Sequence, residues 1–223
     1  MDWLPAIVGG GVALPLGWLF GRYQHLLYRQ PEFRAAPLRN GAWRLLPYVL
    51  ALAVALTTVL ALRPDHYDVG PALLSGLFAA VLLVLSSTDY ERRLIPNRLV
   101  QPAILVALAL CWSWPDRSIQ DVLFGGGFAL LLGGGLFALG MLTGSLMGVS
   151  ITPFGLGDVR LMILMGLLLG WPAIMAALFI GIILGGMPAI VMLFMGRRRS
   201  VYSYGPYLAA GGLYALLWMD RFN

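Results

Sequence analysis

Long apolar runs, separated by short polar connections, constrain this chain more than any other feature of its sequence. Eight such runs fall near residues 3–21, 45–62, 71–88, 97–114, 122–148, 159–171, 172–195 and 206–219. An apolar helix of about 20 residues crosses the roughly 30 Å hydrocarbon core of a bilayer, and a helix satisfies its own backbone hydrogen bonds there. The sequence therefore predicts an all-α polytopic membrane protein with about eight transmembrane helices.

The composition leaves no room for a soluble domain. Of the 223 residues, 60% are hydrophobic and 11% are charged, whereas a soluble domain has about 25% charged residues. Eight spans use about 160 positions. We therefore expect a single polytopic domain over residues 1–223, surrounded by the lipid bilayer and without a separate soluble or zinc-binding domain. No nucleic-acid partner is expected despite the net charge of +5, because no soluble surface is predicted on which the cations could gather.

No metal site is expected from the cysteines and histidines. The single cysteine, Cys111, excludes an internal disulfide and any multi-cysteine metal centre, and we interpret it as a packing residue. His25 and His66 are predicted to lie on opposite faces of the membrane, which argues against a two-histidine site.

The arginines predict the orientation in the membrane. The chain has no lysine, so all 15 cations are arginines. Because cytoplasmic connections carry the excess of positive charge, the connections rich in arginine are assigned to the cytoplasm, and both termini are assigned to the outside. The cytoplasmic set contains Arg22, Arg29, Arg34, Arg39, Arg44, Arg92, Arg93, Arg98, Arg160 and the presumed topology anchor Arg197, Arg198 and Arg199; the outer set contains Arg63, Arg117 and Arg221.

Glycines four residues apart predict close helix packing. In a membrane, such faces let two helix backbones approach each other. The spacing occurs at Gly140, Gly144 and Gly148, at Gly166 and Gly170, and at Gly181 and Gly185.

Three of the ten acidic residues lie where they invite a functional explanation. Asp89 directly follows an apolar run, at a depth where a carboxylate is unfavourable unless it is paired or hydrated. Glu91 is adjacent to Arg92 and Arg93, and we interpret it as part of a solvated ion pair. Asp158 follows Gly155-Leu156-Gly157 and precedes another apolar run. It is either a helix cap, stabilised by the helix dipole, or a functional acid.

The predicted topology favours a functional pair. Asp89 and Asp158 both fall at cytoplasmic ends of predicted spans, so the fold can bring them together. Two adjacent carboxyls tend to hold one proton between them, which is the requirement for aspartic peptide hydrolysis. A helix start favours an ionised Asp158, which predicts Asp89 as the protonated partner. Without lysine, a Schiff base or a Ser–Lys catalyst is excluded.

Two other classes of function remain open on these residues. A proton- or cation-coupled transporter would use the boundary carboxylates to bind its ion, but such proteins often have internally repeated halves, and no repeat is evident here. A non-catalytic membrane scaffold would use the acids only as helix caps.

Three motifs resemble those of the type IV prepilin peptidases, membrane aspartic proteases of the GxGD group. They are Asp89-Tyr90-Glu91-Arg92-Arg93-Leu94-Ile95-Pro96-Asn97, Gly155-Leu156-Gly157-Asp158-Val159-Arg160-Leu161 and Gly205-Pro206-Tyr207-Leu208-Ala209-Ala210-Gly211. The resemblance rests on about 25 residues, in the family's order. It implies an endopeptidase of the bacterial cytoplasmic membrane that cleaves the leader of type IV prepilins or type II secretion pseudopilins, with its active site facing the cytoplasm.

The resemblance also implies roles for individual residues. Asp89 and Asp158 correspond to the catalytic pair of the family, and Gly155 and Gly157 would shape the loop that presents Asp158. Pro96 suits a helix start, where its missing N–H costs nothing. The family more often has lysine at the position of Arg160, so that a planar fork replaces a point charge here.

The first cytoplasmic connection departs from the family. Bifunctional members, which also methylate the new terminus, often carry a four-cysteine zinc site there, but this connection has no cysteine. Zinc is therefore not expected. The stretch from Gly21 to Tyr28-Arg29-Gln30-Pro31 resembles the end of the family's first helix. Proteolysis would need no cofactor, and S-adenosylmethionine would be needed only if methylation is retained. The oligomeric state is not predicted.

Overall fold

The structure, a computed structural model, describes residues 3–30, 33, 46–63, 68–114, 117–146, 155–194 and 203–218. These residues form eight α-helices and one short 3₁₀ helix, without any strand. The helices are α1 (Leu4–Leu27), α3 (Leu46–Ala61), α4 (Val69–Arg92), α5 (Asn97–Ala109), α6 (Ile119–Leu146), α7 (Leu156–Leu169), α8 (Ala173–Phe194) and α9 (Gly205–Trp218), and the 3₁₀ helix is η2 (Cys111–Ser113). The predicted all-α class is confirmed, with one helix for each predicted run.

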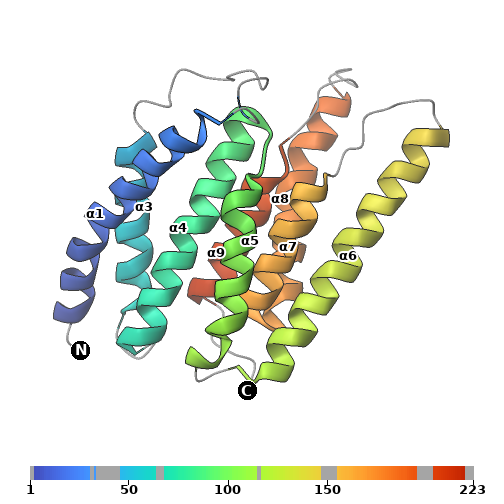
Figure 1. Cartoon of the computed structure of the whole chain (residues 1–223). Coiled ribbons are helices and arrows are strands. Elements are labelled where there is room, and N and C mark those ends of the chain that lie inside the picture. The colour runs from blue at the N-terminus through green and yellow to red at the C-terminus, as the bar shows by residue number, and fades with distance from the viewer. Residues whose placement is uncertain are drawn as a thin grey trace.

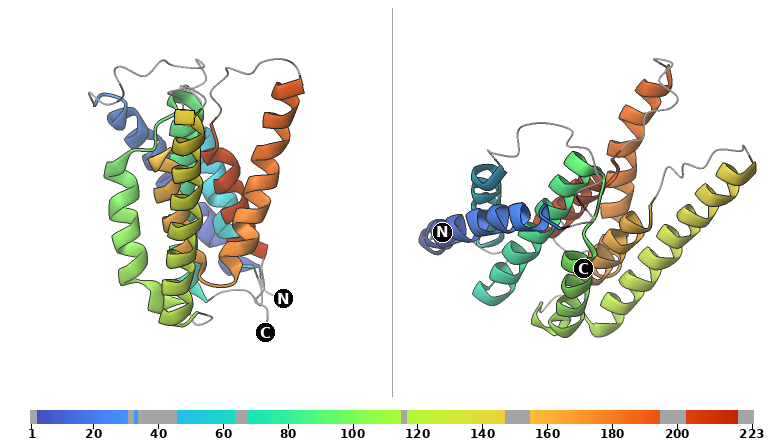
Figure 2. Two further views of the ribbon diagram at one scale, coloured as in Figure 1. Left: turned by 90° about the vertical axis from the view of Figure 1, so that its right-hand side faces the viewer. Right: turned by 45° about the horizontal axis from the view of Figure 1, so that its top comes forward.

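The helices run alternately up and down in a bundle. Consequently α1 begins and α9 ends at the same end of the molecule, the lower end in Figure 1. The other end gathers the C-terminal end of α4 and the N-terminal ends of α5 and α7 (Figures 1 and 2). The alternation matches the predicted topology, in which both termini share one side.

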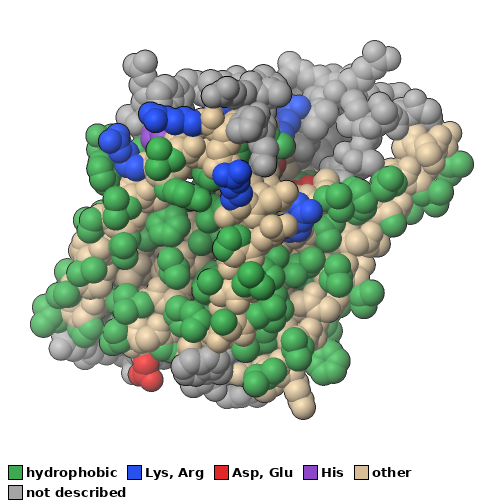
Figure 3. Space-filling view, in the orientation of Figure 1, with side chains coloured by type: hydrophobic (Ala, Val, Ile, Leu, Met, Phe, Trp, Pro, Cys, Tyr) green, Lys and Arg blue, Asp and Glu red, His purple; other side chains and the backbone are tan. Residues whose placement is uncertain are grey.

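The surface of the bundle is that of a polytopic membrane protein. Helices α1, α4 and α6 are long and apolar enough to cross a bilayer, and three further apolar segments are shorter, Pro47–Ala61, Asn97–Ala109 and Ala173–Pro188. Figure 3 shows hydrophobic side chains over the middle of one face and cationic side chains near its upper end. Helices α7 and α9 have 14 residues each, or about 21 Å, which is less than the thickness of the hydrocarbon core.

Helices α4 and α7 form the interior of the bundle. In its most apolar window α4 is 61% buried, whereas α1 and α6 are 28% buried. Nine of the 14 residues of α7 are buried. Helix α9 packs against α4, α7 and α8. The two helices that carry the predicted catalytic acids are therefore held on several sides.

Glycines allow the tightest helix contacts, as predicted, although not all at the predicted positions. A Cβ atom on Gly166 of α7 would lie 2.4 Å from the carbonyl oxygen of Gly125 on α6. Gly181 packs on Leu208, and Gly185 packs on the ring of Tyr204. By contrast, Gly170 ends α7 with φ of 70°, and Gly148 lies outside the described residues.

Several predicted features fall outside the described residues. They include the arginine run 197–199, His66 and the connection between α6 and α7 at 147–154. The start of α7 is described, however, and so is the whole of the Asp89 motif.

Candidate active site

Asp89 lies in the last turn of α4 and is only 7% exposed. The helix ends at Arg92, and the residue that follows it, Arg93, adopts the left-handed conformation with φ of 55° and donates its backbone N–H to the carbonyl oxygen of Asp89 at 2.8 Å. A helix end in this conformation satisfies carbonyls that have no partner within the helix. The local sequence thus stops α4 one turn beyond Asp89.

The segment that precedes α9 holds Asp89 from the other side. The backbone N–H of Gly205 donates to Oδ2 of Asp89 at 2.9 Å. The hydroxyl of Ser203 donates to the carbonyl oxygen of Asp89 at 2.5 Å. A Cβ atom on Gly205 would lie 2.7 Å from Oδ2 of Asp89, so the glycine permits this close approach.

Asp158 is the third residue of α7 and is partly buried. Its Oδ2 atom accepts the backbone N–H of Gly155 at 2.9 Å, and its own N–H donates to the carbonyl oxygen of Gly155 at 3.1 Å. This is the reciprocal bonding that an acid at the third position of a helix can make. The capping interpretation of Asp158 is therefore correct as a description of its local structure, and it leaves the second carboxylate oxygen for other chemistry.

The fold brings the two aspartates to one end of the bundle, close enough to interact electrostatically. Asp158 lies in the first turn of α7, and Asp89 accepts the first N–H of α9. Each carboxylate is thus placed at the positive end of a helix dipole. The sequence predicted this advantage for Asp158 alone, because the approach of α9 to Asp89 spans 116 positions. The assignment of the proton to Asp89 stays a prediction.

The remaining predicted site residues lie at the starts of α5 and α7. Gly157 contacts Ile95, which would lie 3.1 Å from a Cβ atom at that position. Gly155 has φ of −97° and ψ of 160°, which any residue adopts, and no atom of the described residues lies closer than 3.6 Å to its missing Cβ. Pro96 immediately precedes the first residue of α5 and accepts backbone N–H groups through its carbonyl oxygen. It starts the helix, as predicted.

Arg160 joins α7 to α5. Its guanidinium donates to Oδ1 of Asn97, the first residue of α5. This contact holds together the starts of the two helices that follow the aspartate motifs. It gives Arg160 a structural partner other than Asp158.

The interpretation of Glu91 as a solvated ion pair is wrong. Glu91 is 5% exposed, and Oε2 accepts the Tyr28 hydroxyl at 2.5 Å. The Gln24 amide in turn donates to the Tyr28 oxygen at 2.6 Å, and Ser87 donates to Gln24. Burial, and then the bond to Glu91, raise the pKa of the Tyr28 hydroxyl well above its usual value. The partner, 63 positions away in sequence, could not be inferred from the neighbouring arginines.

Sequence reasoning missed Ser203 and Tyr204. Burial raises the pKa of the Tyr204 hydroxyl, and the charge of Asp158 raises it further. Ser203 thus contacts Asp89, and Tyr204 lies close enough to Asp158 to be affected by its charge. The available signal was their position directly before the Gly205-Pro206 motif.

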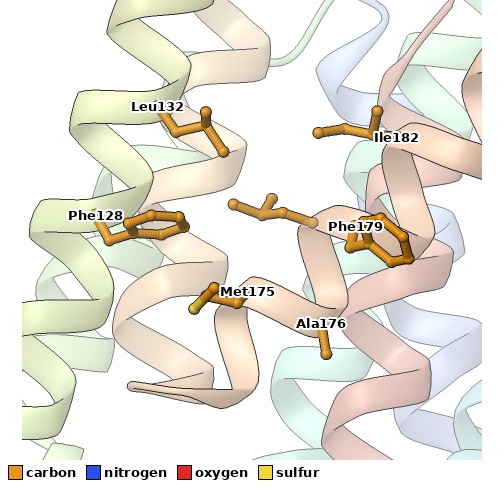
Figure 4. Close-up of a pocket in the computed structure, with 7 residues that line it drawn as sticks. Phe128, Leu132, Met175, Ala176, Phe179 and Ile182 are labelled. Carbon is orange, nitrogen blue, oxygen red and sulfur yellow. The ribbon is translucent and has the colours of Figure 1, made fainter.

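Elsewhere, the described residues offer little chemistry. An apolar hollow of about 380 Å³ lies between α6 and α8, where Phe128 and Leu132 face Met175, Ala176, Phe179 and Ile182 (Figure 4). None of these side chains is ionisable. Among the described residues, no group of three or more His, Cys, Asp and Glu side chains is arranged to hold a metal ion.

Comparison with known proteins identifies relatives of this chain. A model of the type IV leader peptidase family matches residues 76–190, which include both aspartates. A prepilin leader peptidase/N-methyltransferase of Pseudomonas aeruginosa is 30% identical over 142 residues, covering 63% of this chain and 47% of that protein. A protein of the same name from Aeromonas hydrophila is 30% identical and covers 92% of this chain and 66% of that protein. Another, from Pseudomonas putida, is 26% identical and covers 82% of this chain and 70% of that protein.

The match does not span the relatives completely. The aligned part of this chain covers about half the length of the Pseudomonas aeruginosa protein. No solved structure matches the chain.

Proposed function

Because the chain belongs to the type IV leader peptidase family, we propose that it is a membrane-embedded aspartic endopeptidase. Its substrates are type IV prepilins or type II secretion pseudopilins, which it cleaves at the cytoplasmic boundary of the bacterial inner membrane. Asp89 and Asp158 are its catalytic residues.

One observation supports this proposal most strongly. Two acids, from α4 and α7, lie at the same end of the bundle, each beside the start of a helix. Oδ2 of each accepts a backbone N–H, at 2.9 Å in both cases, and these bonds help to orient the two carboxylates. Carboxyls in such a pair share a proton more readily than they ionise together.

The chemistry follows from this shared proton. The ionised carboxylate takes a proton from a water molecule as the water oxygen attacks the scissile carbonyl carbon. The protonated carboxyl donates to the carbonyl oxygen, and a proton then passes to the leaving amine as the C–N bond breaks. The N-termini of α7 and α9 stabilise negative charge at the site.

The orientation of the site agrees with a cytoplasmic cut. Six of the described arginines, Arg22, Arg29, Arg92, Arg93, Arg98 and Arg160, belong to connections or helix ends on the aspartate side. Positive charge marks the cytoplasmic side. A peptide bond entering from the cytoplasm would therefore meet the acids where it reaches the membrane.

Methylation of the new terminus stays a prediction. The relatives are named as methyltransferases as well as peptidases. The ribose and amino-acid parts of S-adenosylmethionine need polar partners, but the hollow between α6 and α8 is apolar, and a second hollow has one acidic residue, Asp121, at the end opposite the aspartate pair. Neither of these two hollows fits this cofactor, and we assign no step to it.

A cleavage assay tests the proposed function. The purified protein in lipid is incubated with a peptide that has a basic leader, a glycine at the cut and an apolar helix. Asp89→Asn and Asp158→Asn should each lower the cleavage rate at least about 100-fold, since each removes a general acid or base. Asp68→Asn is the matched control, because Asp68 is at the opposite end of α4 and makes no side-chain capping bond.

The outcomes also separate the alternatives. Undiminished cleavage by either aspartate variant would remove that residue from the mechanism. If the native protein cleaves nothing but acidifies proteoliposomes through Asp89 and Asp158, the transporter alternative holds. If neither activity is found and both variants still support assembly of a pilus or secretion machine, the protein is a non-catalytic scaffold of that machine. The two acids then act only as helix caps.

A further inference from the structure

We propose that Ser203 and Tyr204 are positioning residues that fix Asp89 by clamping the start of α9 between α4 and α8. This inference rests on the proposed function. Neither residue belongs to the three sequence motifs, and neither contacts the scissile bond in the proposed mechanism.

Ser203 acts on the backbone of Asp89. The carbonyl oxygen of Asp89 accepts both the N–H of Arg93 at 2.8 Å and the hydroxyl of Ser203 at 2.5 Å. Ser203 is 5% exposed, so its hydroxyl has no alternative partner in bulk water. A buried hydroxyl whose bond is lost is costly, which keeps Ser203 against the end of α4.

Gly205 adds a bond to the carboxylate of Asp89, so the clamp consists of Ser203, Tyr204 and Gly205. It is separated from Ser203 by one residue, and its N–H donates to Oδ2 of Asp89 at 2.9 Å. The segment thus grips Asp89 at two atoms, its carbonyl oxygen and its carboxylate. Two bonds to one residue fix the orientation of its side chain as well as its position.

Tyr204 ties the clamp to α8. Its hydroxyl donates to the carbonyl oxygen of Ile182 at 3.1 Å. Its ring lies against Gly185, where a Cβ atom would come within 2.9 Å of ring carbon Cζ. Because glycine at 185 admits the ring, Tyr204 can hold Ser203 and Gly205 at a defined distance from α8.

The consequence is that the geometry of Asp89 depends on side chains outside the catalytic pair. A displacement of about 1 Å at a reacting group can cost about 100-fold in rate. Loosening the clamp should therefore lower kcat and leave KM unchanged, because substrate binding does not use these bonds.

The test compares variants at both positions in the cleavage assay. Ser203→Ala and Ser203→Cys, which has a weak donor, should lower kcat about 10- to 100-fold with unchanged KM, and Ser203→Thr should recover most of the loss. Tyr204→Phe, which keeps the ring, should lower kcat about 2- to 10-fold. Ser75→Ala is the control: Ser75 is a buried serine whose hydroxyl accepts a bond from Trp114, and its variant should keep native kcat.

A measurement without substrate separates this inference from the proposed function. Dicyclohexylcarbodiimide modifies carboxyls within membranes, and mass spectrometry gives its rate at each aspartate. Ser203→Ala should speed modification of Asp89 about 2- to 10-fold, the population change that one hydrogen bond is worth, and should leave Asp158 at its native rate. This result would support the clamp even if the native protein cleaved no peptide.

Two results would overturn the inference. One is that dicyclohexylcarbodiimide modifies Asp89 at the native rate in the folded Ser203→Ala and Ser203→Cys variants. The other is a loss of activity in Ser203→Ala that only parallels its loss of thermal stability, as in Ser75→Ala, and that Ser203→Thr does not recover.

Discussion

At the scale of single residues, the glycines beside the two aspartates are not equivalent. A Cβ atom on Gly205 would lie 2.7 Å from Oδ2 of Asp89, whereas one on Gly155 would lie 3.6 Å from Oδ2 of Asp158. Only the first distance forces a movement, and the group that must move is the proposed catalytic carboxylate of Asp89. Although both glycines belong to motifs, the structure gives a steric reason for Gly205 alone.

We therefore expect Gly205→Ala and Gly155→Ala to differ. Gly205→Ala should lower kcat about 100-fold, because the carboxylate of Asp89 is displaced. The kcat of Gly155→Ala should stay within about threefold of the native kcat, since the backbone conformation at residue 155 suits alanine. The check is kcat for both variants, with thermal unfolding to establish that they are folded. Equal losses would mean that Gly155 has a role that its contacts do not reveal.

The candidate pair was predictable from sequence, but its surroundings were not. Asp89 and Asp158 each lie at the edge of an apolar run and within a motif. Glu91 has equally clear neighbours, Arg92 and Arg93, and yet it bonds to Tyr28 on another helix. Ser203 reaches Asp89 across 114 positions. Contacts between distant segments depend on how helices rotate and approach, which hydropathy does not encode.

At the scale of elements, the apolar runs predicted the helices but not their ends. Helix α1 continues past Arg22 to Leu27, and α4 continues past Asp89 to Arg92. A charge ends an apolar run without ending a helix, because a helix stops only where its backbone bonding stops. The helix α5 stops at Ala109 and is followed by η2, although the apolar run reaches residue 114.

The contact between α6 and α7 depends on glycine, and two neighbouring positions allow a matched test. A Cβ atom on Gly125 would lie 2.5 Å from the carbonyl oxygen of Gly166, whereas no described residue comes within 4 Å of one on Gly127. Gly125→Ala should destabilise the fold by about 1–3 kcal/mol through overpacking and lower cleavage, since α7 carries Asp158. Gly127→Ala should unfold at or above the native temperature, because alanine favours a helix. Thermal unfolding in detergent measures both, and equal stability of the two variants would contradict the packing.

At the scale of the whole molecule, one end of the bundle concentrates positive charge and the aspartate pair together. Only Arg63 and Arg117, among the described arginines, lie at the opposite end. Because positive charge favours the cytoplasmic side, this asymmetry predicts that the aspartate end faces the cytoplasm, the side from which the leader of the proposed substrate would arrive. The proposed substrate therefore depends on this orientation, because acids on the outer side of the membrane could not reach a cytoplasmic leader.

Thiol labelling can decide the orientation, because Cys111 is the only cysteine and is buried. In a Cys111→Ala background, Arg98→Cys places an exposed thiol at the aspartate end, and Asp68→Cys places one at the opposite end. A membrane-impermeant maleimide should label Asp68→Cys in intact spheroplasts and Arg98→Cys only in inverted vesicles. Loss of one arginine leaves the charge asymmetry in place. The reverse pattern would put the aspartates outside the cytoplasm and rule out cleavage of a cytoplasmic leader.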